Sequence, residues 1–418
     1  MSLALLIVPA SAGAATVTSN GATITYQAEG NRRDVVGVRY DAARGKFLIR
    51  EDYGFDDPSS PLNAGPGCVR DPDAFGEGQF SFYAQVACGG AATTTVNLNL
   101  AEGEDYLLID NALPATLTAF GGPERDALIG GPGREILHGG ADGDEVEGGG
   151  GADTLFSDEG SSDGIYGYAS SRFTFGQTAQ QFNAAAAADG GDTLVGGNNV
   201  GSVDGQGGAD VIRPHGSAIV DGGPGPDRII GTALSGEASV DGGTGDDRIT
   251  NLPGRTNASG GGGDDVIQGV RGTTVSGDGG KDKVTGAGDV DGGAGRDTIR
   301  GSAGADDLFG NTGNDLLLGL GGDDDLDGST GDDRALGGPG GDDYAKTFHS
   351  GGCGGNDLFD GQAGRDTAFV SCGLVRLHLR DGGRDVVTCR LPAPVAIARI
   401  LSRDRADKVD GCRRRRPA

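Results

Sequence analysis

A block of six contiguous nine-residue units, from Gly292 to Ala345, constrains the fold of this chain more than any other feature. The units read GGAGRDTIR, GSAGADDLF, GNTGNDLLL, GLGGDDDLD, GSTGDDRAL and GGPGGDDYA. Each unit has Gly at its first and fourth positions and Asp at its sixth, and the eighth is usually apolar. Glycine permits the positive φ that a tight turn needs. The period therefore predicts a stack of coils in which each unit supplies one turn and one strand.

This nonapeptide closely resembles the repeat of the RTX family, which binds Ca²⁺ in a parallel β-helix. The resemblance implies that each ion lies between turns of successive coils, so that the partner turn is two repeats away. The sixth-position residues would then form two sets on opposite edges: Asp297, Asp315 and Asp333, and Asp306, Asp324 and Asp342. Carboxylates and backbone carbonyls of such turns suit a hard cation that takes six to eight oxygens. The eighth residues would point inward as a thin aliphatic core.

Charge and composition agree with bound cations. Acidic residues outnumber Lys and Arg by 61 to 34, which gives a formal net charge of −27. Such a charge opposes a compact state unless counter-ions bind, and it argues against nucleic acid as a partner. Low hydrophobicity with high charge is typical of disordered chains. A flexible linker, however, would not keep Asp and an apolar residue in a fixed register.

Further units flank the block. Residues 121–156 contain four, with Glu124 and Asp142 in place of the fourth-position Gly and Glu135 in place of the sixth-position Asp. Glu is longer by one methylene, so a turn built around Asp would have to shift to use it. After an interruption at KTFHSG, two more units contain Asp357 and Asp366.

Between residues 187 and 300 the Asp residues recur about once per two nonapeptides, with steps of 15 to 20 residues. Short extended pieces separated by ordinary turns lie between them. If one coil is two nonapeptides, this segment has metal-type turns on one side only. A ladder of such turns would begin near Asp192 and run through Asp297 and Asp333, and the six-unit block would add a second ladder on the opposite edge.

The resemblance covers residues 121–369 and assigns Ca²⁺ ligands residue by residue. The candidate metal ligands are Asp126, Asp144, Asp153, Asp192, Asp210, Asp227, Asp247, Asp265, Asp282, Asp297, Asp306, Asp315, Asp324, Asp333, Asp342, Asp357 and Asp366. No cofactor other than several Ca²⁺ ions is expected.

The N-terminal end has features of a secreted protein. An apolar run from Leu3 to Val8 precedes Ala10-Ser11-Ala12 and Ala12-Gly13-Ala14, both of which suit a signal peptidase. Residues 1–15 are therefore predicted to be a signal peptide, although an apolar first strand is the alternative. No stretch approaches the roughly 20 apolar residues that a transmembrane helix needs.

Six cysteines, at positions 68, 88, 353, 372, 389 and 412, indicate an oxidising compartment. Proximity in the sequence favours a Cys68–Cys88 bridge. The other four cysteines can combine in several ways.

We therefore predict an all-β fold: a right-handed parallel β-roll or β-helix solenoid with small β caps at both ends. The expected parts are an N-terminal β cap at 16–115, the calcium-binding roll at 116–369 and a C-terminal β cap with a basic tail at 370–418. An insertion at 157–188, with a short helix at 178–188, interrupts the roll. It could bind a partner, although a loop without a role is the simpler reading.

Motifs for catalysis are weak. There is no HExxH, and the one GxSxG match, at 160–164, lies in a degenerate repeat rather than between a strand and a helix. We expect a secreted, non-catalytic calcium-binding protein with a structural, adhesive or cell-surface role, similar to secreted calcium-binding proteins of high-GC Gram-positive bacteria. The alternative is a secreted hydrolase whose site lies in the N-terminal region or in the 157–188 insertion.

Overall fold

The computed structural model describes residues 15–30, 33–52, 62–71, 83–158, 164–166, 191–196, 202–216, 218–269, 272–286, 288–346, 356–370, 373–379, 384–389, 396–403 and 407–410. These residues form strands, turns and bends, and no helix is found among them. They belong to two compact units, Met1–Asp210 and Val211–Ala418, which we describe separately. In both units parallel strands stack coil on coil, so the prediction of an all-β solenoid is confirmed.

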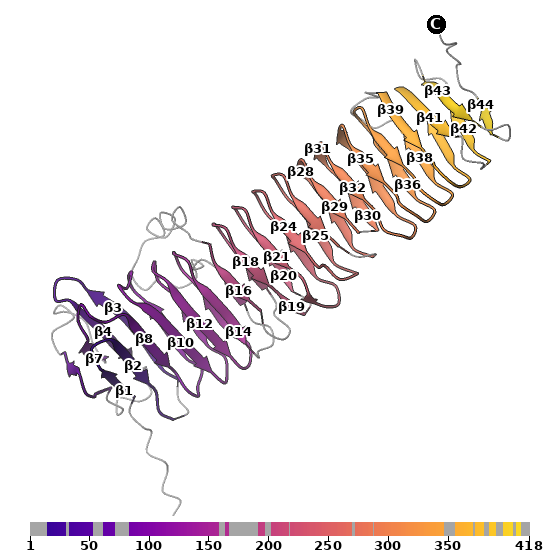
Figure 1. The fold of residues 1–418 in the computed structure, drawn as a ribbon. Helices are drawn as coiled ribbons and strands as arrows, with labels where there is room; N and C mark the ends of the chain where they lie inside the picture. Colours follow the sequence, from indigo (N-terminus) through magenta and orange to yellow (C-terminus); the bar gives the residue numbers. More distant parts are fainter. Residues whose placement is uncertain are drawn as a thin grey trace, which may run out of the picture. The chain divides into compact units, whose positions relative to one another are not determined.

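In the first unit the chain alternates between two parallel sheets (Figure 1). Sheet 1 contains β2 (Thr23–Gln27), β8 (Thr95–Asn99), β10 (Thr116–Gly122), β12 (Glu135–Gly140), β14 (Thr154–Asp158) and β16 (Thr193–Val195). Sheet 2 contains β3 (Val35–Asp41), β9 (Tyr106–Ile109), β11 (Ala127–Ile129), β13 (Glu145–Glu147), β15 (Gly164–Tyr166) and β17 (Ser202–Asp204).

Short, mostly antiparallel strands cover the first coil. β1 (Thr16–Ser19) pairs antiparallel with β2 in sheet 1, and β5 (Asn63–Ala64) pairs in parallel with β1. In sheet 2, β4 (Lys46–Asp52) pairs with β3, β7 (Tyr83–Cys88) with β4, and β6 (Cys68–Arg70) with β7. The cap thereby satisfies strand edges that a bare stack of coils would expose.

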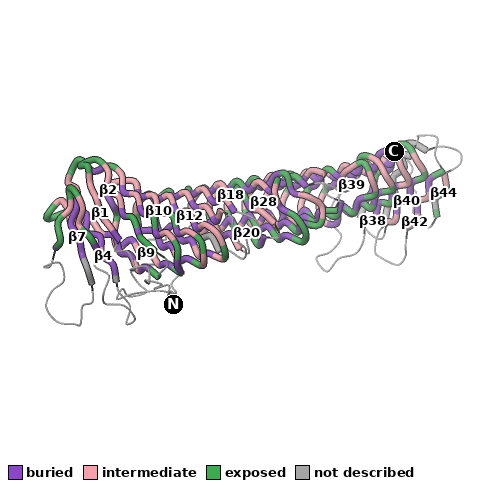
Figure 2. Tube along the Cα trace, turned by 90° about the horizontal axis from the view of Figure 1, so that it is seen from below, coloured by how far each residue is buried: buried purple, intermediate pink, exposed green. Residues whose placement is uncertain are grey.

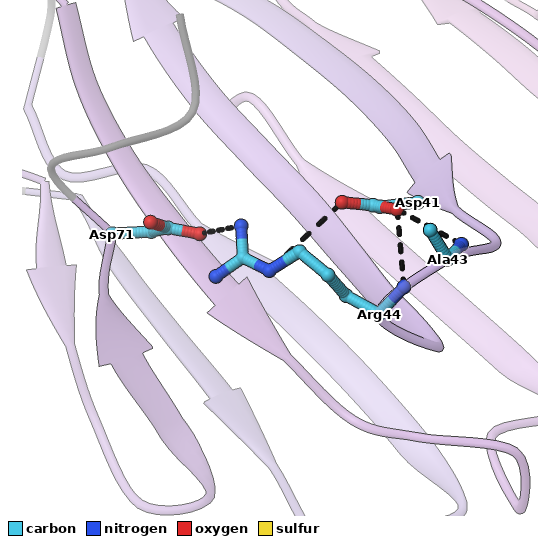
Figure 3. A network of polar contacts seen from close by, with 4 residues as sticks. All are labelled: Asp41, Ala43, Arg44 and Asp71. Atoms are coloured by element: carbon cyan, nitrogen blue, oxygen red, sulfur yellow. Dashed lines mark hydrogen bonds and ion pairs between the residues drawn. The ribbon is translucent and has the colours of Figure 1, made fainter.

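A disulfide and an ion pair hold this cap together. Cys68 and Cys88 lie directly opposite each other on β6 and β7 and form the predicted disulfide. Arg44, in the turn between β3 and β4, lies with its Nη1 atom 2.5 Å from Asp71 Oδ2, and its Nε is 3.9 Å from Asp41 Oδ2 (Figure 3). Asp41 Oδ1 also accepts backbone hydrogen bonds within the same turn. The side chains of the other four cysteines lie outside the described residues.

The second unit repeats the same arrangement. Sheet 1 contains β18 (Val211–Arg213), β21 (Arg228–Ile230), β24 (Arg248–Thr250), β26 (Val266–Gln268), β29 (Lys283–Thr285), β32 (Thr298–Arg300), β35 (Leu316–Leu318), β37 (Arg334–Leu336), β39 (Asn356–Asp360), β41 (Gly373–Leu379) and β43 (Ala396–Arg403). Sheet 2 contains β20 (Ile219–Asp221), β23 (Ser239–Asp241), β25 (Asn257–Ser259), β27 (Thr274–Ser276), β30 (Asp289–Asp291), β33 (Asp307–Phe309), β36 (Asp325–Asp327), β38 (Asp343–Lys346), β40 (Thr367–Val370), β42 (Val386–Cys389) and β44 (Lys408–Asp410).

Short strands also form between the turns of this unit. They are β19 (His215–Gly216) with β22 (Ala233–Leu234), and the set β28 (Gly279–Gly280), β31 (Ala294–Gly295) and β34 (Thr312–Gly313). Backbone pairing therefore continues from the sheets into the turns.

Parallel stacking extends beyond the predicted limits of 116 and 369. At the start, β2 and β3 already pair in parallel with β8 and β9, and at the end β41 to β44 add further coils. These segments lack the glycine-rich turn. Stacking requires only strands in register around a buried residue, as at Leu107 and Val387.

The predicted breakdown of the repeat at 157–188 is partly wrong. β15 keeps its place in sheet 2, with Ile165 in register between Val146 and Val203. Residues 160–163 of the GxSxG match and the helix predicted at 178–188 lie outside the described residues, while Gly164 begins β15.

The core is as thin as the repeat predicts. Most of the three-residue strands bury one inward-facing apolar residue, and Figure 2 shows buried positions alternating with more exposed ones along the coils. Within the six-unit block these residues are Ile299, Leu308, Leu317, Leu326, Ala335 and Tyr344. Burial of so little apolar surface does not offset the conformational entropy lost by a glycine-rich chain.

Candidate calcium-binding turns

Each sixth-position Asp lies immediately before a strand or within its first two residues. Its carboxylate points to the preceding coil. The term edge 1 is used for the turns that lead into sheet 1, and the term edge 2 for the turns that lead into sheet 2. Asp315 Oδ1 accepts a hydrogen bond from the backbone N–H of Asp297 at 2.9 Å, and Asp333 Oδ1 accepts one from Asp315 at 3.0 Å. The same bond joins Asp306 to Asp324 and Asp324 to Asp342 on the opposite edge. The predicted pairing of turns two repeats apart is confirmed.

The second unit has one long and one shorter series of these bonds. On edge 1 the series runs through Asp227, Asp247, Asp265, Asp282, Asp297, Asp315, Asp333 and Asp357. On edge 2 it runs through Asp306, Asp324, Asp342, Asp366, Asp385 and Asp407. The six-unit block is therefore the place where a second series joins the first, as its spacing predicts.

Edge 2 upstream of this junction has ordinary turns. The residues that precede its strands there are Ala218, Ala238, Thr256, Thr273 and Gly288. Edge-1 turns of the same coils, at 222–227, 242–247, 260–265, 277–282 and 292–297, all contain six residues, whereas the edge-2 turns at 214–218, 231–238, 251–256, 269–273 and 286–288 vary from three to eight. A constant length is what a repeated ligand geometry requires.

The first unit has a series on each edge. On edge 1, Glu135 is joined to Asp153, Asp192 and Asp210 in turn. On edge 2 the series starts before the first predicted repeat, because Asp34 donates to Asp105 and Asp105 donates to Asp126, which is joined to Asp144.

Besides Glu135, four members of these series are absent from the predicted ligands: Asp34, Asp105, Asp385 and Asp407. A signal was available for two of them, since Gly103-Glu104-Asp105-Tyr106-Leu107 and Gly383-Arg384-Asp385-Val386-Val387 keep the Gly-x-Asp-x-apolar half of the motif. All four form the bond without the complete glycine-rich turn. The bond to the neighbouring coil is therefore a property of the stack, and a metal site needs more than this Asp alone.

The second carboxylate oxygen marks the candidate metal position. Oδ2 is buried and accepts no hydrogen bond from the described atoms in eight turns: Asp126, Asp247, Asp265, Asp282, Asp297, Asp315, Asp324 and Asp342. It faces the first Gly of its own unit and the carbonyl of the first Gly one coil later. A Cβ placed on Gly292 would lie 2.9 Å from Asp297 Oδ2 and 3.0 Å from Gly310 O, and one on Gly310 would lie 2.7 Å from Asp315 Oδ2. A carboxylate and a carbonyl thus converge on one gap in seven of the eight turns, the exception being the turn of Asp342.

Burial raises the pKa of these carboxyl groups, and neighbouring Asp residues in the series raise it further. The pKa is raised to about 6 at Asp247, to about 7 at Asp315 and to about 8 at Asp126. The hydrogen bond from the preceding coil lowers the pKa but does not cancel the effect of burial. An ionised carboxylate here is costly unless a cation compensates it.

These donors fit Ca²⁺ better than a transition metal. The described residues contain no group of three or more His, Cys, Asp or Glu side chains arranged to hold a metal ion. The carboxylate and the carbonyl that face the gap are both oxygen donors, which Ca²⁺ prefers. The residues that would hold it are the sixth-position Asp and the first Gly of the next coil.

Three predicted or flagged positions differ from this pattern. Glu135 uses its extra length to accept a hydrogen bond from Gly131 N–H in its own turn. Asp306 accepts bonds from the backbone and side chain of Ser302. Asp357 Oδ2 accepts a hydrogen bond from the buried hydroxyl of Tyr344 at 3.2 Å. Asp306 and Asp357 thus have a protein donor that the eight turns above lack, whereas Glu135 keeps its Oε1 buried and without a hydrogen bond from the described atoms.

Position 5 supplies a second series that runs in the opposite direction. Asp246 Oδ1 accepts from Asp264 N–H at 2.8 Å, and Asp264 Oδ1 accepts from Lys281 N–H at 2.9 Å, so here the later coil donates to the earlier one. Asn314 accepts from Asp332 in the same way. These turns are fixed to both neighbouring coils by adjacent side chains.

Replacement of Asp264 by Ala is expected to lower the stability of the calcium-loaded chain by about 1 kcal/mol, because one backbone amide loses its acceptor. Asp264→Asn should stay near the wild-type value, since an amide oxygen can accept the same bond, as Asn314 does. Urea unfolding measures both. Lys281→Ala is the control, because the Lys281 backbone amide donates the bond and its side chain does not. Equal losses for Ala and Asn would contradict the hydrogen-bond role.

Several turns place a residue other than Gly in the left-handed region. Glu124 and Asp142, which replace the fourth-position Gly, have φ values of 72° and 75°, and Leu320, at a second position, has 84°. Such conformations are unfavourable for residues with a Cβ. The deviations from the motif are therefore accommodated at a cost in backbone strain.

Leu320→Gly is expected to stabilise the chain by up to about 1 kcal/mol, because the relief of strain exceeds the added freedom of the unfolded chain. Little packing is lost, since Leu320 is 36% exposed. In the same turn, Gly322→Ala should be strongly destabilising, because its φ is 121° and the new Cβ would meet the backbone of Gly304. The urea midpoints of the two variants should move in opposite directions, and a shift of both in one direction would contradict the strain argument.

Parallel coils whose glycine-rich turns present a buried series of Asp carboxylates define a calcium-binding β-roll. A family model of the RTX calcium-binding nonapeptide repeat matches the chain in four copies, over residues 129–162, 285–317 and 352–369. These three segments of the chain thus carry repeats of the RTX calcium-binding type. None of the curated proteins matches it. The described residues include no helix that is long and apolar enough to cross a membrane.

Proposed function

We propose that this protein binds several Ca²⁺ ions in the glycine-rich turns and that these ions complete its fold, outside the cell, in a structural, adhesive or cell-surface role. One observation supports this above all: in seven of the eight turns a buried carboxylate oxygen without a protein donor faces a carbonyl of the next coil. A divalent cation in that gap would compensate the carboxylates that burial destabilises.

Counting the bound ions by isothermal titration calorimetry tests the assignment. The variant Asp297→Ala/Asp315→Ala is expected to bind fewer Ca²⁺ ions than the wild type, because it removes two neighbouring carboxylates of edge 1. The matched control is Asp307→Ala/Asp325→Ala, which removes two exposed charges from β33 and β36 and should keep the wild-type stoichiometry. An unchanged count in the first variant would remove these residues from the site.

Secretion is part of the proposal. The structure places Ala15 inside the fold, where it is buried and its carbonyl accepts a hydrogen bond from Asn63 N–H at 2.8 Å. Cleavage after Ala14, one residue before the predicted end of the signal peptide, would leave this residue in place. Mass spectrometry of the mature N-terminus in the culture medium tests the cleavage, and recovery of the intact chain from the cells alone would contradict it.

We assign no catalytic chemistry to the chain. No feature of the described residues favours a hydrolase in the N-terminal region, and the 157–188 segment lies largely outside them. Assays of the calcium-loaded chain on ester, peptide and glycan substrates test this part of the proposal, and turnover abolished by a single substitution would overturn it.

A further inference from the structure

The outer face of sheet 2 in the second unit contains a groove of about 480 Å³ across β23, β25, β27, β30 and β33. Two columns of outward side chains line it, because the middle residue of each strand points into the core. One column consists of Ser239, Asn257, Thr274 and Asp289, which are in register on successive strands. The groove therefore presents a new polar side chain at every strand, about 4.8 Å apart.

The second column is polar as well and ends in an aromatic ring. It consists of Asp241, Ser259, Ser276, Asp291 and Phe309. Ser276 Oγ donates to Asp278 at 2.6 Å, and Ser259 Oγ and the Asn311 amide donate to Asp278 and Asp291. These bonds order the wall of the groove before any ligand binds.

Exposed apolar side chains flank the polar stretch. Phe309 is 45% exposed at one end, and Ile219, 63% exposed, is in register with Ser239 beyond the other end. In the part of the chain that the structure describes, few large apolar side chains are so exposed. A ligand that fits must combine hydrogen-bonding groups with apolar faces, as a sugar ring does when it stacks on an aromatic side chain.

Charge selects among such ligands. The lining includes the carboxylates of Asp241, Asp289 and Asp291 and no Lys or Arg. An anionic chain is therefore repelled and a cationic one attracted. A sugar unit of an extended glycan is also close in length to the strand spacing, so successive units can meet equivalent side chains. We infer that this groove binds a linear glycan that carries free amino groups.

The test is calorimetric titration of the full chain, in saturating Ca²⁺ and slightly below neutral pH, with a glucosamine hexamer. Saturable binding is expected. Phe309→Ala should weaken it about fivefold to tenfold, the loss typical of one aromatic contact. Asp289→Asn should weaken it about threefold and reduce its dependence on salt. Phe120→Ala is the matched control, because Phe120 is a 46% exposed aromatic side chain in the first unit, and it should leave affinity unchanged.

Three outcomes would overturn the inference. Absence of saturable binding excludes the glycan. Equal affinity for the N-acetylated hexamer excludes recognition of the amino groups. Tighter binding of a lysine hexamer, unaffected by Phe309→Ala, would show a surface for basic peptides instead. None of these results depends on the ion count, so the inference and the proposed function can fail separately.

Discussion

Chelation of Ca²⁺ from the full chain is expected to abolish most of the β-sheet circular dichroism of residues 187–369, and readdition should restore it cooperatively. The buried carboxylates of successive coils lie next to one another, as the series from Asp227 to Asp357 shows. Without a cation they repel each other in an environment of low polarity. The thin aliphatic core does not compensate for this repulsion, so metal binding and folding are coupled.

Mg²⁺ provides the control for this experiment. It demands a compact octahedral shell and keeps much of its water, so the same concentration should restore little of the signal. The antiparallel strands of the N-terminal cap, joined by the Cys68–Cys88 disulfide, do not depend on the glycine-rich turns and should retain part of their structure. Full β-sheet content in excess chelator would contradict the coupling.

Acidification of the calcium-free chain is expected to increase its β-sheet content between about pH 8 and pH 4. The folded-state pKa values are raised from 3.8 to about 6 at Asp265, about 7 at Asp282 and about 8 at Asp126. A raised carboxyl pKa means that the folded state holds the proton more tightly than the unfolded state. Its contribution to stability is complete below the unfolded pKa and is lost as the pH rises through the folded value.

Protons therefore take over part of the role assigned to Ca²⁺, and calcium affinity should fall over the same range of pH because both compete for the carboxylates. Circular dichroism in chelator and calcium titrations at several pH values measure the two effects. In the variant Asp265→Asn/Asp282→Asn both substituted side chains are uncharged at every pH. Its β-sheet content in chelator should therefore depend less on pH than that of the wild type. A calcium-free chain that loses β-sheet content as the pH falls from 8 to 5 would contradict the argument.

The repeat made much of the fold predictable. One turn and one strand are defined by Gly at positions 1 and 4, Asp at position 6 and an apolar residue at position 8. The sequence distances between successive Asp residues from Asp210 to Asp297 indicate that only one edge has the motif there. The predicted partners of Asp297 and Asp306 are confirmed by hydrogen bonds to the expected coils. A strict period is informative because every coil must place the same atoms against its neighbours.

Features without the full motif were not predictable in this way. Alternating residues around Leu107 or Val387 indicate a strand but not whether its neighbours are parallel, so the sequence does not show how far parallel stacking continues beyond the calcium-binding repeats. The hydrogen bonds at position 5 depend on the side-chain rotamers of Asp246 and Asp264, which the sequence repeat does not predict. The donor that satisfies Asp357 comes from Tyr344, 13 residues earlier, and is visible only in three dimensions.

The unequal lengths of the two sets of turns in the second unit have an evolutionary consequence. On edge 1 a single inserted residue would displace a carboxylate from its partner in both neighbouring coils, so selection should remove it. On edge 2 upstream of Gly288 the turns already differ in length, from 286–288 to 231–238, while the strands beside them keep their register. The solenoid can therefore accept insertions in these turns of edge 2, one loop at a time, without displacing the Asp series of edge 1.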